Sequence, residues 1–416
     1  MAPLHHMVRI RQPDDFDYIR SGLMDEAVVN ANQLENSSQS TAAVLWCTTL
    51  PFSVDPVLWR FQLPAWSDNG KGDVKRNYKR LGTEYAQGTG VTLGPTPILD
   101  VVSTDDQWRA IARNTITYQR DRLLKIPTQL ELLDDLRELR PVRLVAPALV
   151  AFTKSEDRLN RLMVEASADA AGNAVGAQVI IPVERLVDRG EVDSVLASVP
   201  TDGVSSYLIS TPKVTEERLI TDDAMLSSLI YAVATLADRG VAVGHQYANY
   251  TILALSSVGL AAATHHLGWT DHGEPAEEQG LRVRSCQLYV PGVRHCVRFP
   301  EASRLGRSLT GDEYTERFCG CAFCRGAFEE ETHPLDILLE SRTVTIRDRD
   351  RLTPSSQAVG ANTWHYLLSR RLEVEAFSRA PASEVIARDI ERAAYLSRDG
   401  DVTRLTHLAN QLPAAS

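Results

Sequence analysis

The sequence predicts an α/β protein built on a (β/α)8 TIM-like barrel, with a smaller subdomain late in the chain and helices at the C-terminus. Short apolar runs alternate with longer amphipathic segments from about residue 41 to residue 264. Such alternation implies parallel strands joined by crossover helices. The chain has 416 residues, enough for a large barrel and an appendage.

Seven short apolar runs are the expected barrel strands, which leaves one strand of a closed barrel unassigned. The helices between them show apolar residues at helical spacing, as at Leu159, Leu162, Met163 and Ala166. An open doubly wound sheet is the rival fold, but no glycine-rich phosphate-binding fingerprint follows the first strand. The expected strands are Ala42–Cys47, Pro97–Val102, Val142–Ala148, Ala177–Pro182, Ser205–Ser210, Val241–Gly244 and Leu260–Thr264, and the expected helices include Asp105–Leu124, Ser155–Ala170 and Asp223–Asp238.

The composition limits the class of protein. No stretch of about 18 uninterrupted apolar residues predicts a membrane span, and no secretory signal is evident at the N-terminus. Six cysteines, half of them in one cluster, fit a reducing cytoplasm. The net charge of −10 argues against a protein that coats nucleic acid indiscriminately. A local basic segment, residues 71–80, can still contact phosphates, and its expected contacts are Lys75, Arg76 and Lys79.

Cys319, Cys321 and Cys324 stand so close together that they suit a metal ion better than a disulfide. A Cys3His set closes a tetrahedral zinc site of the structural kind. His365 is the preferred fourth ligand because it opens an amphipathic helical run. The alternatives are His295, Cys296 and His333, or a cluster of cysteines that binds no metal. The domain boundary is therefore expected near residue 281. Residues 1–281 form the barrel with an N-terminal extension, and residues 282–416 form an irregular β segment, the zinc-binding subdomain and the C-terminal helices.

Candidate catalytic residues lie where expected strands end, because active sites of parallel barrels form at the carboxyl ends of the strands. Asp100 is a carboxylate in an apolar strand and can serve as a general base or stabilise a cationic sugar. His245 and His265 end two later strands and are candidate proton donors. Each can also be a buried structural histidine. The substrate-binding candidates beside them are Gln246, Tyr247, Tyr250 and Trp269.

The late Cys-Gly-Cys-x-x-Cys motif, with its three cysteines at 319, 321 and 324, and the helix that opens on His365 resemble the tRNA-guanine transglycosylase superfamily and its DNA-acting relatives. In that family a zinc subdomain follows the strands of a TIM barrel and helps to grip nucleic acid. The resemblance covers about the C-terminal quarter of the chain. Two departures stand out: no glycines follow Asp100, and the expected late strand before Trp269 carries no carboxylate nucleophile.

The resemblance implies an enzyme that cleaves the N-glycosidic bond of a flipped nucleotide in a nucleotide-sized barrel opening. Without a late nucleophile we expect hydrolysis, so the first hypothesis is a DNA glycosylase that excises a modified base, with phage defence as its suggested role. The alternatives are a base-exchanging tRNA or DNA transglycosylase of the 7-deazaguanine type, a barrel that binds nucleic acid without catalysis, and a barrel enzyme acting on small molecules. The expected partner is nucleic acid, DNA before tRNA. The expected cofactor is structural zinc, and a homodimer is the candidate assembly.

Overall fold

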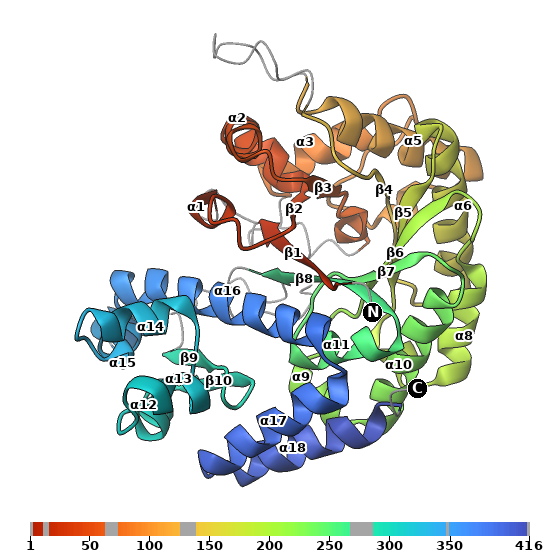
Figure 1. Ribbon diagram of the computed structural model, residues 1–416. Helices are drawn as coiled ribbons and strands as arrows, with labels where there is room; N and C mark the ends of the chain where they lie inside the picture. The colour runs from red at the N-terminus through yellow and green to blue at the C-terminus, as the bar shows by residue number, and fades with distance from the viewer. Residues whose placement is uncertain are drawn as a thin grey trace.

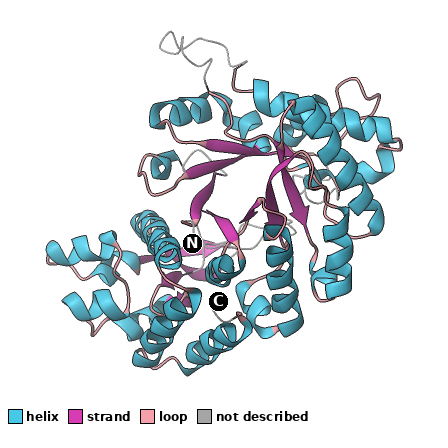
Figure 2. Cartoon of the chain, turned by 45° about the vertical axis from the view of Figure 1, so that its right-hand side comes forward, coloured by secondary structure: helices cyan, strands magenta, loops and turns pink. Residues whose placement is uncertain are grey.

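The computed structural model describes residues 3–10, 16–62, 74–124, 139–266, 286–346 and 349–413. Eight parallel strands form one sheet in the order β3-β2-β1-β8-β7-β6-β5-β4, and a bridge between Ser53 and Arg143 joins its two edges. Figure 2 shows the strands inside a ring of helices. The predicted (β/α)8 fold class is confirmed. The strands are β1 (His5–Ile10), β2 (Glu26–Asn30), β3 (Phe52–Asp55), β4 (Val145–Ala146), β5 (Val175–Ile180), β6 (Val204–Ser210), β7 (Ala242–His245) and β8 (Leu260–His266).

The first three strands lie earlier in the chain than the sequence predicts. β1 and β2 occupy the segment expected to be an N-terminal extension, which therefore belongs to the barrel, and β3 follows the first expected strand without overlapping it. The expected strand Ala42–Cys47 is wrong, because it lies inside helix α2 (Ala31–Thr48). The expected strand Pro97–Val102 is also wrong, because its centre forms the one-turn helix α4 (Ile98–Val101). The other five predicted strands overlap β4 to β8.

The helices around the barrel follow the predicted alternation. The three expected helices are confirmed as α5, α6 and α10, and both α5 and α6 begin with a capping box formed by Thr104 and Thr153 respectively. Such boxes satisfy backbone N–H groups that the first turn leaves without partners. The helical elements of this part are α1 (Phe16–Ile19), α2, the 3-10 turn η2 (Leu58–Phe61), α3 (Arg76–Tyr85), α4, α5 (Asp105–Asp121), α6 (Lys154–Ala171), α7 (Val183–Leu186), α8 (Arg189–Ser198), α9 (Glu216–Thr221), α10 (Asp223–Ala237), α11 (Tyr250–Ala254) and the 3-10 turn η5 (Leu255–Val258).

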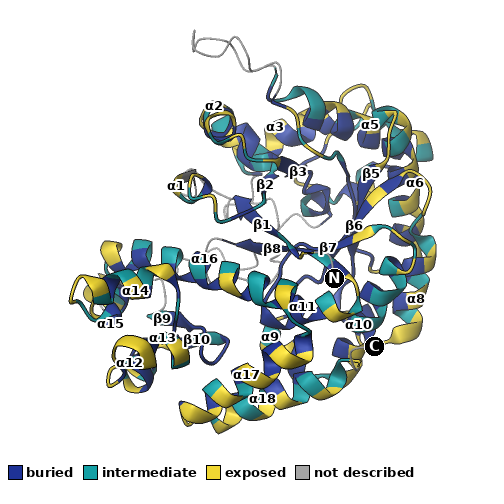
Figure 3. Cartoon of the chain, in the orientation of Figure 1, coloured by how far each residue is buried: buried dark blue, intermediate teal, exposed yellow. Residues whose placement is uncertain are grey.

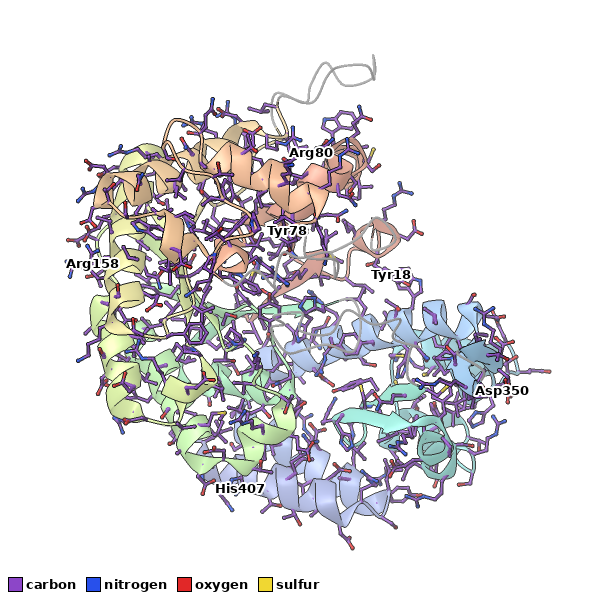
Figure 4. The ribbon with its side chains drawn as sticks, turned by 180° about the vertical axis from the view of Figure 1, so that it is seen from behind. Tyr18, Tyr78, Arg80, Arg158, Asp350 and His407 are labelled. Carbon is purple, nitrogen blue, oxygen red and sulfur yellow. The ribbon has the colours of Figure 1, made fainter. Side chains whose placement is uncertain are left out.

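The C-terminal part begins with a small antiparallel hairpin and ends in three helices. In Figure 1 the long helix α16 runs beside β1 and β8, with the hairpin and the short helices on its other side. A second hairpin projects from the short helices, and Figure 4 shows its Asp350 at the edge of the molecule. The elements are β9 (Gln287–Val290), β10 (His295–Arg298), α12 (Phe299–Gly306), α13 (Gly311–Arg317), α14 (Ala322–Glu329), α15 (Pro334–Leu338), β11 (Ser341–Ile346), β12 (Arg349–Pro354), α16 (Ser356–Arg379), α17 (Ala382–Tyr395) and α18 (Asp399–Gln411).

Alternation along the strands decides which side chains enter the barrel. Successive side chains of a strand point to opposite faces, and Met7, Val28 and Ala262 pack together inside. Their neighbours Val243 and Ala263 instead join the apolar core between the sheet and the helices. Figure 3 shows buried strands beneath helices whose outer faces are exposed. Among the described residues, no helix has the length and apolar character needed to cross a membrane.

Candidate metal centre and barrel mouth

Cys319, Cys321, Cys324 and His365 meet in one buried cluster, as the sequence predicts. Their ligand atoms all lie within 4.8 Å of one another. His365 Nδ1 lies 3.7, 3.5 and 3.4 Å from the sulfurs of Cys319, Cys321 and Cys324. Tetrahedral zinc with ordinary Zn–S and Zn–N bonds places sulfur and nitrogen about 3.6 Å apart. The cluster can therefore hold a metal ion without rearrangement.

The second nitrogen of His365 supports the same conclusion. Nε2 lies 2.8 Å from the backbone oxygen of Tyr289 in β9, and it donates a hydrogen bond to that carbonyl. The proton on Nε2 leaves the lone pair of Nδ1 facing the three sulfurs. Metal-binding histidines are commonly oriented in this way by a partner behind the ring.

The loop around the cysteines is shaped for ligation. A Cβ on Gly320 would come within 2.9 Å of the Thr315 backbone oxygen, so the turn between the first two cysteines requires glycine. Burial and the neighbouring thiols of Cys319 and Cys321 raise the pKa of Cys324. Three thiolates can thus share this site only if a cation compensates their charge.

His295, Cys296 and His333 are not part of the cluster among the described residues. His333 caps α15 and contacts the Leu309 carbonyl, while His295 pairs with Asp401. The choice of His365 over these three is consistent with the geometry.

A buried ion network ties this subdomain to the C-terminal helices. Glu373 of α16 accepts hydrogen bonds from the Tyr289 hydroxyl, at 2.5 Å, and from Arg294, at 2.8 Å. Arg294 also forms a two-point pair with Asp389 of α17, with distances of 2.9 and 2.6 Å. Arg370 completes the network with a 2.7 Å contact to Glu373. Because Tyr289 also holds His365, the network connects the metal cluster to α17.

A second polar cluster lies at the carboxyl ends of the barrel strands. We call it the mouth cluster, and it comprises Arg9, Asn30, Asp55, Gln178, Gln246, Tyr247 and His266. Arg9 Nη1 donates to Asp55 Oδ2 and to Asn30 Oδ1, each at 2.5 Å. Both Arg9 and Asp55 are buried. Asp55 ends β3 and Arg9 lies near the end of β1, so the barrel itself brings this ion pair together.

Further donors and rings fix the mouth cluster in place. The other carboxylate oxygen of Asp55 accepts from Gln178 Nε2 at 2.9 Å and from the Val57 backbone N–H at 3.0 Å. The Tyr247 ring stacks on His266, with centroids 5.0 Å apart, and the Arg9 guanidinium lies 4.8 Å from the Tyr247 centroid. Together these contacts give Asp55 one orientation.

The mouth cluster still holds polar atoms without partners. Within the described residues, Arg9 Nε and Nη2 and Gln178 Oε1 are buried and make no hydrogen bond. Buried polar groups are almost always paired, so such atoms indicate a site for a polar ligand. A cavity of about 10 Å³ adjoins the cluster, lined by Ser53, Asp55 and Gln246 among others. This volume suits one water molecule, so this cavity is not the nucleotide-sized opening expected from the sequence.

The predicted catalytic residues do not enter the mouth cluster. Asp100 is exposed on the short helix α4 and ends no strand. His245 and His265 point away from the barrel interior, because their partners Ile209 and Ala263 or Val8 lie on the helix side of the sheet. Burial lowers the pKa of His245 to about 3 and lowers that of His265 well below its usual value. Burial thus disfavours the imidazolium form that an acid catalyst needs at both positions.

The predicted substrate-binding residues divide into three groups. Gln246 and Tyr247 belong to the mouth cluster, as expected. Tyr250 does not, because it lies buried behind the barrel and donates to Asp389 at 2.5 Å, so its predicted stacking role is wrong for this arrangement. Trp269 lies outside the described residues.

The predicted phosphate contacts lie at the start of α3. Arg76 and Lys79 are exposed, and Lys75 is half-buried at the N-cap of this helix. Figure 4 shows Arg80 on the same helix, farther out than Tyr78. Burial raises the pKa of Tyr78, Arg60 lowers it, and Tyr247 and Asp55 raise it further. The start of α3 is therefore an electrostatic neighbour of the mouth cluster.

Fold and site define a (β/α)8 barrel protein with a buried Cys3His metal-binding cluster in a late subdomain. No model of a known protein family matches the sequence, and no curated protein matches it.

Proposed function

We propose that this protein is a zinc-dependent barrel that cleaves the N-glycosidic bond of a flipped nucleotide, by hydrolysis, and that Asp55 takes the role first assigned to Asp100. The observation that carries the proposal is the buried, doubly oriented Asp55 carboxylate at the carboxyl end of β3. Barrel enzymes place their reacting groups at these strand ends. The resemblance to tRNA-guanine transglycosylases in the cysteine motif points to nucleobase chemistry.

The metal in this proposal is zinc with a structural role. Three thiolates and one imidazole are the ligands that structural zinc prefers, and with four protein ligands no position is open for water. Zinc would hold α13, α14 and α16 together. The chemistry would take place in the mouth cluster.

In the proposed reaction, Asp55 activates a water that adds to the sugar carbon as the bond from that carbon to the base nitrogen breaks. The carboxylate also stabilises the cationic sugar that develops. Arg9 and Gln178 hold the carboxylate in position. The departing base takes up the proton that Asp55 removes from water, and His266 at the end of β8, the imidazole of the mouth cluster, would pass it on. This cavity has room for one water molecule, so a base enters it only if side chains of the mouth cluster move. If the stacked rings of Tyr247 and His266 separated, a base could stack between them.

The test is release of a free base from DNA or tRNA with natural and modified bases, followed by mass spectrometry. Asp55→Asn and Asp55→Glu should both abolish release. The second variant keeps the charge beside Arg9 and so guards against a folding defect. Asp100→Asn, at an exposed position, should retain wild-type activity.

The same experiment separates the alternatives. Incorporation of a labelled free base would indicate base exchange, and binding with no released base in any substrate would indicate a non-catalytic nucleic-acid protein. Full activity of both Asp55 variants would overturn the assignment of Asp55.

A further inference from the structure

A cleft of about 250 Å³ lies away from the barrel mouth, between the metal-binding subdomain and the C-terminal helices. One wall consists of Thr315, Phe318 and Gly320, from α13 and the metal-binding loop. The other wall comes from α16 and α17, and the β9–β10 turn contributes Arg294. The cleft is thus built from four segments that are distant in the sequence.

Guanidinium groups outnumber carboxylates along this cleft. Arg294, Arg388 and Arg392 line it, and Asp389 is the buried carboxylate among them. Asp389 already accepts two hydrogen bonds from Arg294 and one from Tyr250. The Arg392 guanidinium lies 3.3 Å from Asp389 Oδ1, an oxygen that already accepts a hydrogen bond from Arg294.

Arg388 has still less compensation. Its side chain is exposed, its Nε donates to the backbone oxygen of Glu384 at 3.4 Å, and it forms no ion pair among the described residues. The remaining acid of the lining, Glu316, is exposed. Burial lowers the pKa of Arg392 and so do the nearby Arg294 and Arg388, while Asp389 offsets part of this effect. The charged form of Arg392 is disfavoured by the positive charges beside it, so a bound anion would stabilise it.

We propose that this cleft binds the phosphate group of a small phosphorylated ligand such as a nucleoside monophosphate. Arg388 and Arg392 are four residues apart on α17, so their side chains lie on the same helix face. Two guanidinium forks present several parallel donors, which match the oxygens of a phosphate. A volume of about 250 Å³ exceeds what a bare phosphate fills, and Phe318, Leu372 and Val385 offer apolar surface to the rest of the ligand.

This assignment does not depend on the proposed reaction at the barrel mouth. The cleft shares no lining residue with the mouth cluster. Its ligand would instead bridge α17 and the metal-binding loop, because Arg388 and Arg392 come from the first and Gly320 from the second. Occupation of the cleft should therefore hold the subdomain against the C-terminal helices.

Titration calorimetry on the metal-loaded full chain tests the proposal with four probes at matched ionic strength: inorganic phosphate, deoxyadenosine monophosphate, deoxyadenosine, and a single-stranded oligonucleotide without terminal phosphates. The monophosphate should bind saturably and deoxyadenosine should not. Binding of the monophosphate alone identifies a free phosphorylated ligand, whereas binding of the oligonucleotide alone identifies a backbone phosphate as the source.

The double variant Arg388→Ala/Arg392→Ala should weaken this binding by about tenfold or more, as expected from the loss of charge-assisted hydrogen bonds. Arg379→Ala removes an arginine of α16 whose side chain is 77% exposed and lies outside the cleft, and it should leave the affinity unchanged. Asp55→Glu should bind the monophosphate with wild-type affinity even though it releases no base. Failure of the cleft proposal can thus be distinguished from failure of the proposed reaction. Absence of saturable binding by every phosphate-containing probe, or equal affinity in the double variant, would overturn the proposal.

Discussion

Asp55 and Asp100 show how differently two aspartates of one chain can be situated. Asp55 is buried against Arg9 and two further hydrogen-bond donors, whereas Asp100 is exposed on a one-turn helix. In the sequence, Asp100 follows a longer apolar run and so looks like the better strand-end carboxylate. The partners that distinguish Asp55, Arg9 and Gln178, are 46 and 123 residues away along the chain. No local sequence pattern predicts these contacts.

The Arg9–Asp55 pair leads to a stability prediction that is independent of function. Asp55→Asn leaves the guanidinium of Arg9 buried without a counter-charge, which costs about 3–5 kcal/mol of unfolding free energy. Urea unfolding of this variant and of Asp100→Asn measures the difference, and the second variant should lie within about 0.5 kcal/mol of wild type. A loss below about 1 kcal/mol for Asp55→Asn would contradict the electrostatic account of the mouth cluster.

His365 and His333 provide a matched pair for the metal centre. His365→Ala removes a ligand whose Nδ1 faces three sulfurs, so we expect bound metal to fall far below one equivalent after dialysis. His333→Ala removes the cap of α15, a contact to Leu309 and ring contacts with Tyr314 and Phe328, but no atom of the metal cluster, so its metal content should equal that of wild type. Elemental analysis of the purified variants decides between them. Equal metal content in both variants would show that His365 is not a ligand.

Local patterns predicted the metal cluster well because its ligands are mostly local. Three of the four lie within six residues, from Cys319 to Cys324, and a turn that needs Gly320 brings them together. The fourth, His365, lies within α16, which begins at Ser356; the expectation that the helix opens on His365 is therefore wrong, although the residue is correct. The two strand-end histidines are the opposite case: a shift of one residue along a strand changes its face, and His266 rather than His265 lies in the mouth cluster.

At the scale of elements, the helices and the later strands were predictable and the first three strands were not. β5, β6 and β8 carry apolar runs of ordinary strand length between recognisable helices. β1 contains two histidines and an arginine within six residues, and β3 has only four residues. Both therefore lack a pattern that stands out, although the barrel buries them. The run Ala42–Cys47 is apolar enough for a strand, but period-2 alternation is missing and it lies within a helix.

The elements around the metal should respond to its removal as a unit. The cluster is fully buried and contributes to a small core with α12, α13, α14 and the β9–β10 hairpin. Chelation should therefore increase hydrogen exchange in residues 286–340, because uncompensated thiols replace a cross-link at the centre of this core. The strands β5 to β8 belong to a separate core and should keep their protection. Hydrogen-exchange mass spectrometry before and after chelation checks this. Equal loss of protection in both regions would show that the metal supports the whole chain.

At the scale of the whole molecule, α16 is the element that holds barrel and subdomain together. Its central part carries His365, Arg370 and Glu373, and near its C-terminal end Ser378 accepts from the Leu4 backbone N–H at 2.9 Å. The same helix covers the strands that present His6 and His265 outward, and these two rings meet edge to face at 5.1 Å. Buried neutral histidines are thus part of how the barrel wall packs.

Because His6 and His245 are buried, we expect the free energy of unfolding to fall in mild acid. Burial lowers the pKa of His245 to about 3 and that of His6 to about 4. In the unfolded chain both titrate near 6.5, so below this pH the unfolded state binds more protons and the free energy of unfolding falls. For His245 alone, lowering the pH from 7 to 5 should lower the free energy of unfolding by about 2 kcal/mol, since each unit below 6.5 contributes about 1.36 kcal/mol.

Urea unfolding at both pH values should show that His245→Asn loses this much of the wild-type pH dependence, because asparagine cannot take up the proton but can accept a hydrogen bond from the Tyr247 N–H. His407→Asn, at a partly exposed histidine of α18, controls for the loss of a histidine as such. An unchanged pH dependence in His245→Asn would mean that the folded protein protonates this ring as readily as the unfolded chain does.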